Sequence, residues 1–200
     1  PSVPQCSMGK NVVVEYVTMK SIVTFTILLV FIGSGCKESA KVKTPLDLAG
    51  NAVDPLGQSN DKTTVLIFTR TDCPIANRYA PELGRLFEQF SPSGIEFWLV
   101  YPDADESAEM VQRHVREYRY PFQAIRDPHH SLVNRTGVQV TPEAAVFLPG
   151  QNLIYRGRID DWYVDFGKAR HEPTKRDLHG VLENVVRGTP QEMRTTTAVG

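Results

Sequence analysis

The residue of this 200-residue chain best suited to covalent chemistry is Cys73. A continuous β-branched and aromatic run, Val65 to Phe68, comes shortly before it and predicts a short buried strand. Pro74 follows directly and suits the first position of a helix, because its missing N–H group has no intrahelical partner there. Cys73 is therefore expected at the helix N-cap, where unpaired backbone N–H groups and the positive end of the helix dipole stabilise a nucleophilic thiolate.

Charged and hydroxyl side chains flank this cysteine in the sequence. Arg70 favours the thiolate by its positive charge, whereas Asp72 opposes it. Thr69 and Thr71 offer hydroxyl groups near the sulfur. The alternative interpretation is structural, because a cysteine that closes a buried strand can serve as a small hydrophobic residue only.

Residues 73–76, Cys-Pro-Ile-Ala, occupy the place of the Cys-x-x-Cys motif of thioredoxins. Phe68 and Pro81 stand where that family has its strand phenylalanine and its helix-kinking proline. Further on, residues 137–148 look like the family's cis-proline loop, with Thr141-Pro142, followed by a core strand. Together these motifs resemble the redoxin branch of the thioredoxin superfamily, which contains alkyl hydroperoxide reductase/thiol-specific antioxidant proteins and thioredoxin-like lipoproteins.

The resemblance covers residues 44–188 and implies an α/β, thioredoxin-like fold, with a central mixed β-sheet flanked by helices on both faces. It implies no cofactor and no metal, and an external thiol or a thioredoxin-type reductant as partner. The site residues expected on this basis are, for catalysis, Cys73, Thr141, Pro142 and Arg70, and, for substrate binding, Thr71, Glu143 and Trp162.

The chain also departs from its relatives. Ala76 replaces the second cysteine of the motif, so the internal disulfide of ordinary dithiol exchange cannot form. Peroxiredoxins carry Pro-x-x-x-Thr-x-x-Cys, but Leu66 and Arg70 stand at the proline and threonine positions here. Copper chaperones with a similar strand end need a second cysteine where this chain has Asn77.

The N-terminal part resembles an export signal. Lys20 precedes an apolar run, Ile22 to Ile32, which is short for a membrane span but suits a signal-peptide core. Small residues then lead to Cys36, as in a bacterial lipobox. We expect residues 1–18 to lie upstream of the true start, residues 19–36 to form the signal, and Cys36 to carry the lipid. A cleaved secretory signal, an uncleaved anchor and a cytosolic core segment are the alternatives.

The protein is accordingly expected to be exported and membrane-anchored through lipid, facing the periplasm or the cell exterior. Of its three cysteines, only Cys73 would then remain as a free thiol.

The net charge of −1, with basic and acidic residues interspersed, gives no hint of nucleic-acid binding. His129 and His130 are adjacent, which makes a poor metal site, and we expect them to open a short surface helix.

Residues 41–188 form the expected redoxin domain, and residues 189–200 a C-terminal tail. In the first half of the domain we expect a short hairpin within 41–62, the active-site helix over 74–90, a strand over 95–100 and an amphipathic helix over 105–118. In the second half we expect a strand over 122–125, a short helix near 131–135, a hairpin turn at 149–152 and a strand over 153–160. A closing helix follows over 174–187, with Thr174 and Asp177 as a capping box.

An insert over 160–173 carries three aromatic residues, including Trp162. It is either a packed loop that covers the sheet edge or a partner surface, since exposed aromatic and arginine side chains dominate binding hot spots.

Two functions stay open for the whole domain. One is a thiol oxidoreductase that uses Cys73 on a peroxide or a protein disulfide; the other is a redoxin-fold binding module without turnover. Sulfenic acid formation on Cys73 discriminates between them.

Overall fold

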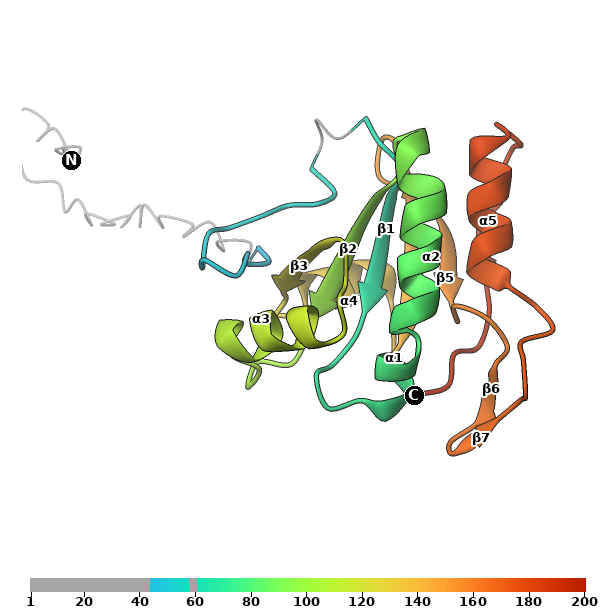
Figure 1. The fold of residues 1–200 in the computed structure, drawn as a ribbon. Helices are drawn as coiled ribbons and strands as arrows, with labels where there is room; N and C mark the ends of the chain where they lie inside the picture. Colours follow the sequence, from blue (N-terminus) through green and yellow to red (C-terminus); the bar gives the residue numbers. More distant parts are fainter. Residues whose placement is uncertain (1–43, 58–60) are drawn as a thin grey trace, which may run out of the picture. The chain divides into compact units, whose positions relative to one another are not determined.

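The computed structural model describes residues 44–57 and 61–200. Its main sheet has the strand order β3-β2-β1-β4-β5-β8 (Figure 1). The central strand β1 (Thr64–Phe68) runs parallel to β2 (Glu96–Tyr101) and antiparallel to β4 (Glu143–Leu148). Outside these lie β3 (Gln123–Arg126) and β5 (Asn152–Gly157). The mixed sheet expected from the sequence is therefore confirmed.

Alternate residues of β1 supply two separate hydrophobic cores, one on each face of the sheet. Val65 and Ile67 belong to the first, and Leu66 and Phe68 to the second. This follows from the period of two in a strand, which sends successive side chains to opposite faces. A strand buried on both faces has no polar side, and that explains its continuous apolar sequence.

Helices cover both faces. The first core is closed by α1 (Pro74–Arg78), α2 (Ala80–Phe90), α3 (Ala108–Glu117) and α5 (Asp177–Val186), and α2 and α5 stand side by side in front of the sheet in Figure 1. The second core is covered by α4 (Ser131–Thr136), which contributes Leu132. Cys73 therefore lies where β1 leads into the helices of the first face.

The predicted continuous helix over 74–90 is wrong in one respect. The segment forms two helices, with Tyr79 as the C-cap of α1 and the N-cap of α2. Pro81 lies in the first turn of α2, and its lack of an N–H group removes the bond that would join the two helices. The helix that begins beside Cys73 is thus only five residues long.

The capping box predicted for the closing helix is also wrong. The α5 helix begins at Asp177, and Arg176 at its N-cap makes no side-chain cap bond. Thr174 instead donates from its backbone and its hydroxyl group to the carboxylate of Asp161. Although burial of Asp161 opposes the effect, these bonds and one from Lys175 lower its pKa to about 2.

Two further elements differ from the sequence pattern. The helix expected over 105–118 begins at Ala108, because Ser107 accepts a hydrogen bond from the Met110 N–H group and caps it. Within 44–57, the expected hairpin is reduced to a single antiparallel bridge between Leu46 and Ala52. The turn between them is held by the carboxylate of Asp47, so few strand pairs are left to form.

The C-terminal part adds structure that the sequence pattern did not predict. Residues of the insert form a small hairpin of β6 (Tyr163–Asp165) and β7 (Lys168–Ala169). Strand β8 (Arg194–Thr195) lies within the predicted tail and pairs with β5 in parallel. A short 3-10 turn, Ser91–Ser93, follows α2.

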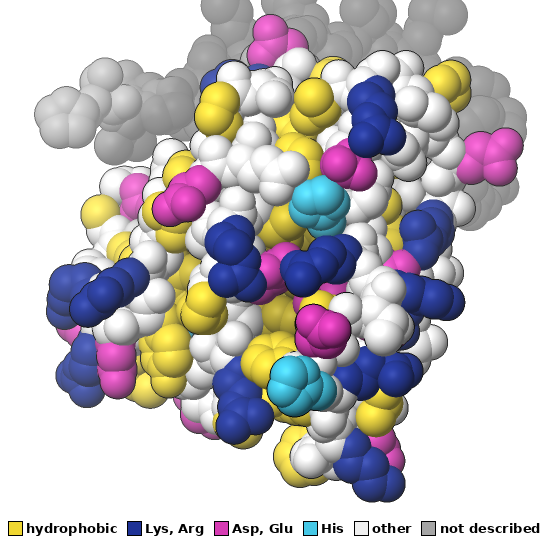
Figure 2. Space-filling model, turned by 45° about the vertical axis from the view of Figure 1, so that its right-hand side comes forward, with side chains coloured by type: hydrophobic (Ala, Val, Ile, Leu, Met, Phe, Trp, Pro, Cys, Tyr) yellow, Lys and Arg dark blue, Asp and Glu magenta, His cyan; other side chains and the backbone are white. Residues whose placement is uncertain are grey.

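The predicted signal segment over 19–36, including Cys36, and the predicted upstream residues 1–18 lie outside the described residues. Within 44–57 and 61–200, no helix combines the length and the apolar character that a membrane crossing requires. On the face shown in Figure 2, acidic side chains lie between basic ones, and no single-sign patch dominates it.

Candidate active site

Cys73 is the N-cap of α1, as predicted, with φ −81° and ψ 107°. Its sulfur accepts a hydrogen bond from the Ala76 N–H group at 3.4 Å. The thiol also donates to the backbone carbonyl of Thr141 at 3.2 Å. Cys73 is half-buried and packs against the first core. Cys73 is thus held between one donor and one acceptor.

The Thr141–Pro142 peptide bond is cis, as predicted. Glu143, the first residue of β4, is 5 % exposed and folds its carboxylate back over this loop. One of its oxygens accepts hydrogen bonds from the N–H groups of Gln139 at 2.8 Å and Val140 at 3.4 Å. Its other oxygen lies 3.7 Å from Nε of Arg156. The buried carboxylate therefore braces the loop that carries the Thr141 carbonyl.

Arg70 lies in the loop between β1 and α1, and its guanidinium group is engaged by two acids. Its Nε lies 3.0 Å from Asp72, and a terminal nitrogen lies 2.8 Å from Asp103. These pairs tie the loop that precedes Cys73 to the segment that follows β2. The charge of Arg70 is therefore shared between two carboxylates rather than directed at the sulfur alone.

Thr71 is held by a buried acid that the sequence did not reveal. The Thr71 N–H group donates to Oε1 of Glu106 at 2.6 Å, and the Thr71 carbonyl accepts from the side-chain amide of Asn77 at 3.2 Å. Glu106 is 4 % exposed, and its second oxygen has no hydrogen-bond partner among the described residues. Burial raises the pKa of this carboxyl group, and hydrogen bonds from Thr71 oppose the rise.

A buried histidine continues this network. Asn77 donates its amide to Thr71, so its oxygen accepts, and Nε2 of His114 is the donor to it at 2.7 Å. The other ring nitrogen, Nδ1, then accepts from the hydroxyl group of Tyr101 at 2.8 Å in the neutral ring. Burial lowers the pKa of His114, which favours this neutral form. The chain Tyr101–His114–Asn77 thereby fixes the backbone two residues before Cys73.

The insert packs against α1. Trp162 meets the ring of Tyr79 edge-on with centroids 5.6 Å apart, and its indole N–H donates to the Arg170 carbonyl at 2.8 Å. The Tyr79 hydroxyl group donates to Asp160 at 2.6 Å, and burial raises the pKa of both groups. Trp162 is therefore packed, in agreement with the interpretation of the insert as a covering loop. Phe166 at the hairpin tip does not fit that interpretation, because it is 72 % exposed.

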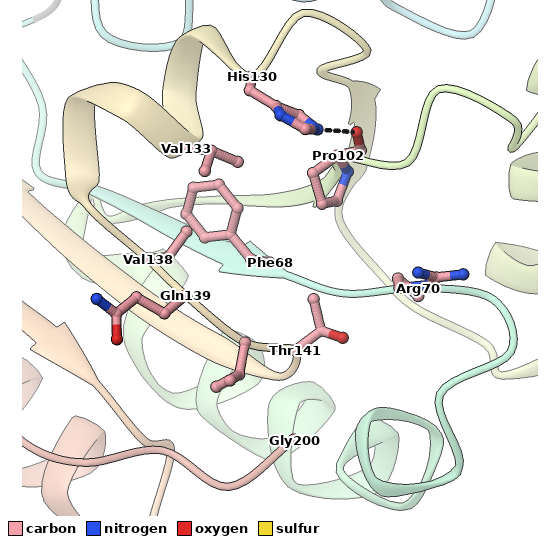
Figure 3. Close-up of a pocket in the computed structure, with 10 residues that line it drawn as sticks. Phe68, Arg70, Pro102, His130, Val133, Val138, Gln139, Thr141 and Gly200 are labelled. Carbon is pink, nitrogen blue, oxygen red and sulfur yellow. Dashed lines mark hydrogen bonds between the residues drawn. The ribbon is translucent and has the colours of Figure 1, made fainter.

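A cleft of about 360 Å³ opens beside the cis-proline loop (Figure 3). Its wall is largely apolar, and its polar lining comes from Arg70, Gln139, Thr141 and His130. The His130 ring donates to the carbonyl of Pro102 at 3.0 Å across the rim. In the structure, His130 is the N-cap of α4, in agreement with the expected start of a short helix. The apolar walls of this cleft suit a hydrophobic side chain bound beside the cis-proline loop.

Glu106→Gln provides a test of the buried acid. The raised pKa in the folded state means that Glu106 contributes stability below its unfolded pKa, and that this contribution is lost as pH rises through the folded pKa. The amide of glutamine keeps an acceptor for the Thr71 N–H group and does not ionise. We expect Glu106→Gln to unfold with a free energy similar to that of the wild type at pH 4, and higher by on the order of 1 kcal/mol at pH 8.

Urea unfolding at both pH values measures this difference. The exposed Glu88→Gln is the matched control and should show no such change with pH. A Glu106→Gln variant that is less stable than the wild type at pH 8 would contradict the burial argument.

The structure thus gathers Cys73, Thr141, Pro142, Arg70 and Thr71 at one end of the sheet. Trp162 packs against Tyr79 at the end of α1, and Glu143 accepts hydrogen bonds from the loop that carries Thr141. Sequence reasoning missed the four supporting residues Tyr79, Glu106, His114 and Asp160. A faint signal existed for His114, which lies three residues after the buried Val111 on the apolar face of α3.

A model of the AhpC/TSA family matches residues 38–159. The thiol-disulfide oxidoreductase ResA of Halalkalibacterium halodurans is 27 % identical to this chain over 96 residues, which are 48 % of this chain and 53 % of that protein. The chain therefore spans about half the length of this curated relative.

Solved structures share the fold at low sequence identity. An uncharacterized conserved protein from Geobacillus kaustophilus superposes with a TM-score of 0.63 at 22 % identity, over 76 % of this chain and 85 % of that one. The thioredoxin domain of a thiol-disulfide oxidoreductase from Bacteroides vulgatus does so with a TM-score of 0.53 at 18 % identity, over 72 % and 91 %. These likenesses establish the thioredoxin-like fold. With the family model matched over most of the redoxin domain, this chain belongs to the AhpC/TSA family.

Proposed function

We propose that this protein is an exported, membrane-anchored thiol oxidoreductase that uses Cys73 as a single nucleophile on a protein disulfide or a peroxide. The observation that carries the proposal is the placement of the sulfur. It is half-buried at a helix N-cap, accepts from the Ala76 N–H group and lies 3.2 Å from the Thr141 carbonyl. The name of the relative from Halalkalibacterium halodurans supports thiol-disulfide chemistry, and the AhpC/TSA family match supports the redoxin assignment.

In the disulfide reaction, the Cys73 thiolate attacks one sulfur of the substrate. A bond forms between Cys73 and that sulfur, and the other substrate sulfur leaves as a thiolate. With a peroxide, the thiolate takes the terminal oxygen, the O–O bond breaks, and Cys73 becomes a sulfenic acid while an alcohol or water leaves. An external thiol then attacks the Cys73 sulfur and displaces the substrate thiol, or water from the sulfenic acid. A second external thiol attacks the first one and releases the Cys73 thiolate, so the two external thiols leave as a disulfide. Both come from outside because Ala76 supplies no internal thiol.

The other site residues have supporting roles in this proposal. The Thr141 and Pro142 backbone aligns the substrate beside the sulfur, and Glu143 holds that loop in place. Arg70 keeps the preceding loop closed through its two carboxylate partners. Thr71 offers its polar groups on the other side of Cys73, and Trp162 extends the binding surface across α1.

Trapping on the intact chain tests the proposal. The protein is treated with one equivalent of a peptide disulfide, or of hydrogen peroxide followed by dimedone, and then digested with trypsin. The fragment 71–78 contains Cys73 and no other cysteine, so its mass reports this thiol alone. We expect a mixed disulfide or a dimedone adduct on this fragment. A fragment that stays unmodified at pH 8 until the protein is denatured would favour the binding module without turnover.

We further propose that Cys36 carries the lipid anchor, on the grounds of the apolar run before it. Changing Cys36 to serine should then move the protein from the membrane fraction to the soluble fraction, since stable attachment requires the acyl chains. Fractionation with immunodetection measures the shift, and Ser39→Ala, three residues after Cys36, serves as the control. Continued membrane retention of Cys36→Ser would indicate an uncleaved apolar helix instead.

A further inference from the structure

Residues 194–200 run along the free edge of the sheet towards the thiol. They begin as β8, which pairs in parallel with β5 through Tyr155 and Arg156, and they reach the loop around Thr141 (Figures 1 and 3). Most of these residues are exposed or half-buried, and the strand itself has only two residues. The segment is therefore an added strand on an edge rather than part of either core.

Thr196 is the main attachment point of this segment. Its N–H group donates to the Arg156 carbonyl at 3.1 Å. Its hydroxyl group accepts from the Arg158 N–H group at 3.1 Å and lies 2.7 Å from the Tyr155 hydroxyl group. The Tyr155 hydroxyl also donates to the Arg158 carbonyl, so the Thr196 hydroxyl donates its own proton to the Tyr155 oxygen. The neighbouring Thr197 is exposed and makes no side-chain bond among the described residues.

Two further contacts hold the segment at its ends. Arg194 pairs with the buried carboxylate of Asp177, which also binds Arg158 at 2.8 Å. Val199 packs against the first hydrophobic core, the same one that Cys73 contacts. One end of the segment is thus fixed at α5 and the other lies close to the active site.

Two glycines permit the close approach. Gly157 has φ +153°, and a β-carbon there would overlap the backbone and hydroxyl group of Thr196. A β-carbon on Gly200 would overlap the Thr141 carbonyl group. This carbonyl is the one that accepts the hydrogen bond of the Cys73 thiol. Main-chain atoms of residue 200 therefore occupy the space next to the cis-proline loop.

We propose that residues 194–200 form an internal strap that occupies the place of an extended substrate peptide at the cis-proline loop. The strap must leave this place before a polypeptide segment can pair there, whereas a small reagent reaches the half-buried Cys73 without displacing the strap. The inference rests on the proposed function for the identity of the substrate, a protein disulfide presented on an extended segment. The strap pairs with β5 over only two residues and is largely exposed, so it is easy to displace.

The test compares two probes on the chain of residues 1–200. The small probe is iodoacetamide, and the large probe is an eight-residue peptide joined by a disulfide to thionitrobenzoate. The variants are Thr196→Ala, a chain lacking residues 194–200, and Thr197→Ala as the matched control. The rate of modification of Cys73 is followed on the tryptic fragment 71–78, and circular dichroism checks that each variant is folded.

Thr196→Ala removes the two side-chain hydrogen bonds that fix the strap, which should raise the rate with the peptide probe about tenfold. The truncated chain should show an equal or larger increase. Iodoacetamide should react at similar rates with all four proteins, and Thr197→Ala should match the wild type with both probes.

Equal peptide-probe rates in the wild type and the truncated chain would overturn the strap. An equal increase with both probes would also overturn it, because the change would then lie in the exposure of the sulfur. If Cys73 reacts with neither probe in any folded variant, the proposed thiol chemistry fails, and that outcome is distinct from failure of the strap.

Discussion

Cys73→Ser should reduce the reaction with peptide disulfides and with peroxide to the level of the buffer blank. A serine hydroxyl group is not ionised at neutral pH and forms neither a mixed disulfide nor a sulfenic acid. The variant should still fold, because serine is among the most favourable helix N-cap residues and can accept the Ala76 N–H bond in place of the sulfur.

Release of the leaving thiolate from a coloured peptide disulfide measures this loss. The exposed Glu88→Gln is the matched control, since it changes one side chain of α2 and leaves Cys73 in place. Retention of the reaction in Cys73→Ser would show that another cysteine carries it. The midpoint of thermal unfolding of the variant should be close to that of the wild type. A variant that fails to fold would show that Cys73 has a structural role.

Ala76→Cys should convert the one-cysteine centre into a dithiol centre. The Ala76 N–H group lies 3.4 Å from the Cys73 sulfur, and residues three apart on a helix have β-carbons roughly 5 to 6 Å apart. A disulfide needs β-carbons at roughly 3.5 to 4.5 Å, so a small adjustment of the five-residue α1 closes the bond. Because Ala76 is 1 % exposed, the new thiol is shielded from solvent and attacks the mixed disulfide from within.

The expected result is a fragment 71–78 lighter by two hydrogens after oxidation, and a mixed disulfide that clears without added thiol. In the wild type, the mixed disulfide should persist until an external thiol is supplied. The double variant Cys73→Ser/Ala76→Cys is the control and should form no internal bond. An oxidised Ala76→Cys protein that keeps two free thiols in this fragment would show that α1 holds the two side chains apart.

Local patterns determined much of this protein. The apolar run Val65 to Phe68 gave a strand buried on both faces, because alternate side chains must enter two cores. Pro74 placed Cys73 at a helix N-cap, since proline is tolerated only where no intrahelical N–H bond is lost. The motif around Thr141-Pro142 identified the loop that contacts the sulfur, although Thr141 lies 68 positions after Cys73 in the sequence.

The sequence alone failed where distant side chains compete for local groups. Thr174 has the spacing of a helix cap, but the carboxylate of Asp161 takes its donors, and α5 begins three residues later. Pro81 belongs to the same helical pattern as Pro74, but its missing N–H group ends α1 at Tyr79. A one-dimensional pattern does not show which of two acceptors a donor will reach.

The supporting parts of the site were decided by tertiary structure. Glu106 and His114 carry no motif, and they act on the thiol loop only because β2 and α3 bring them beside Thr71 and Asn77. The strap over residues 194–200 reads as a polar tail, yet it pairs with β5 because that edge is free and Gly157 leaves room for Thr196. Spacing along the chain predicts a helix end or a buried strand, whereas contacts between remote segments depend on which surfaces the complete fold leaves open.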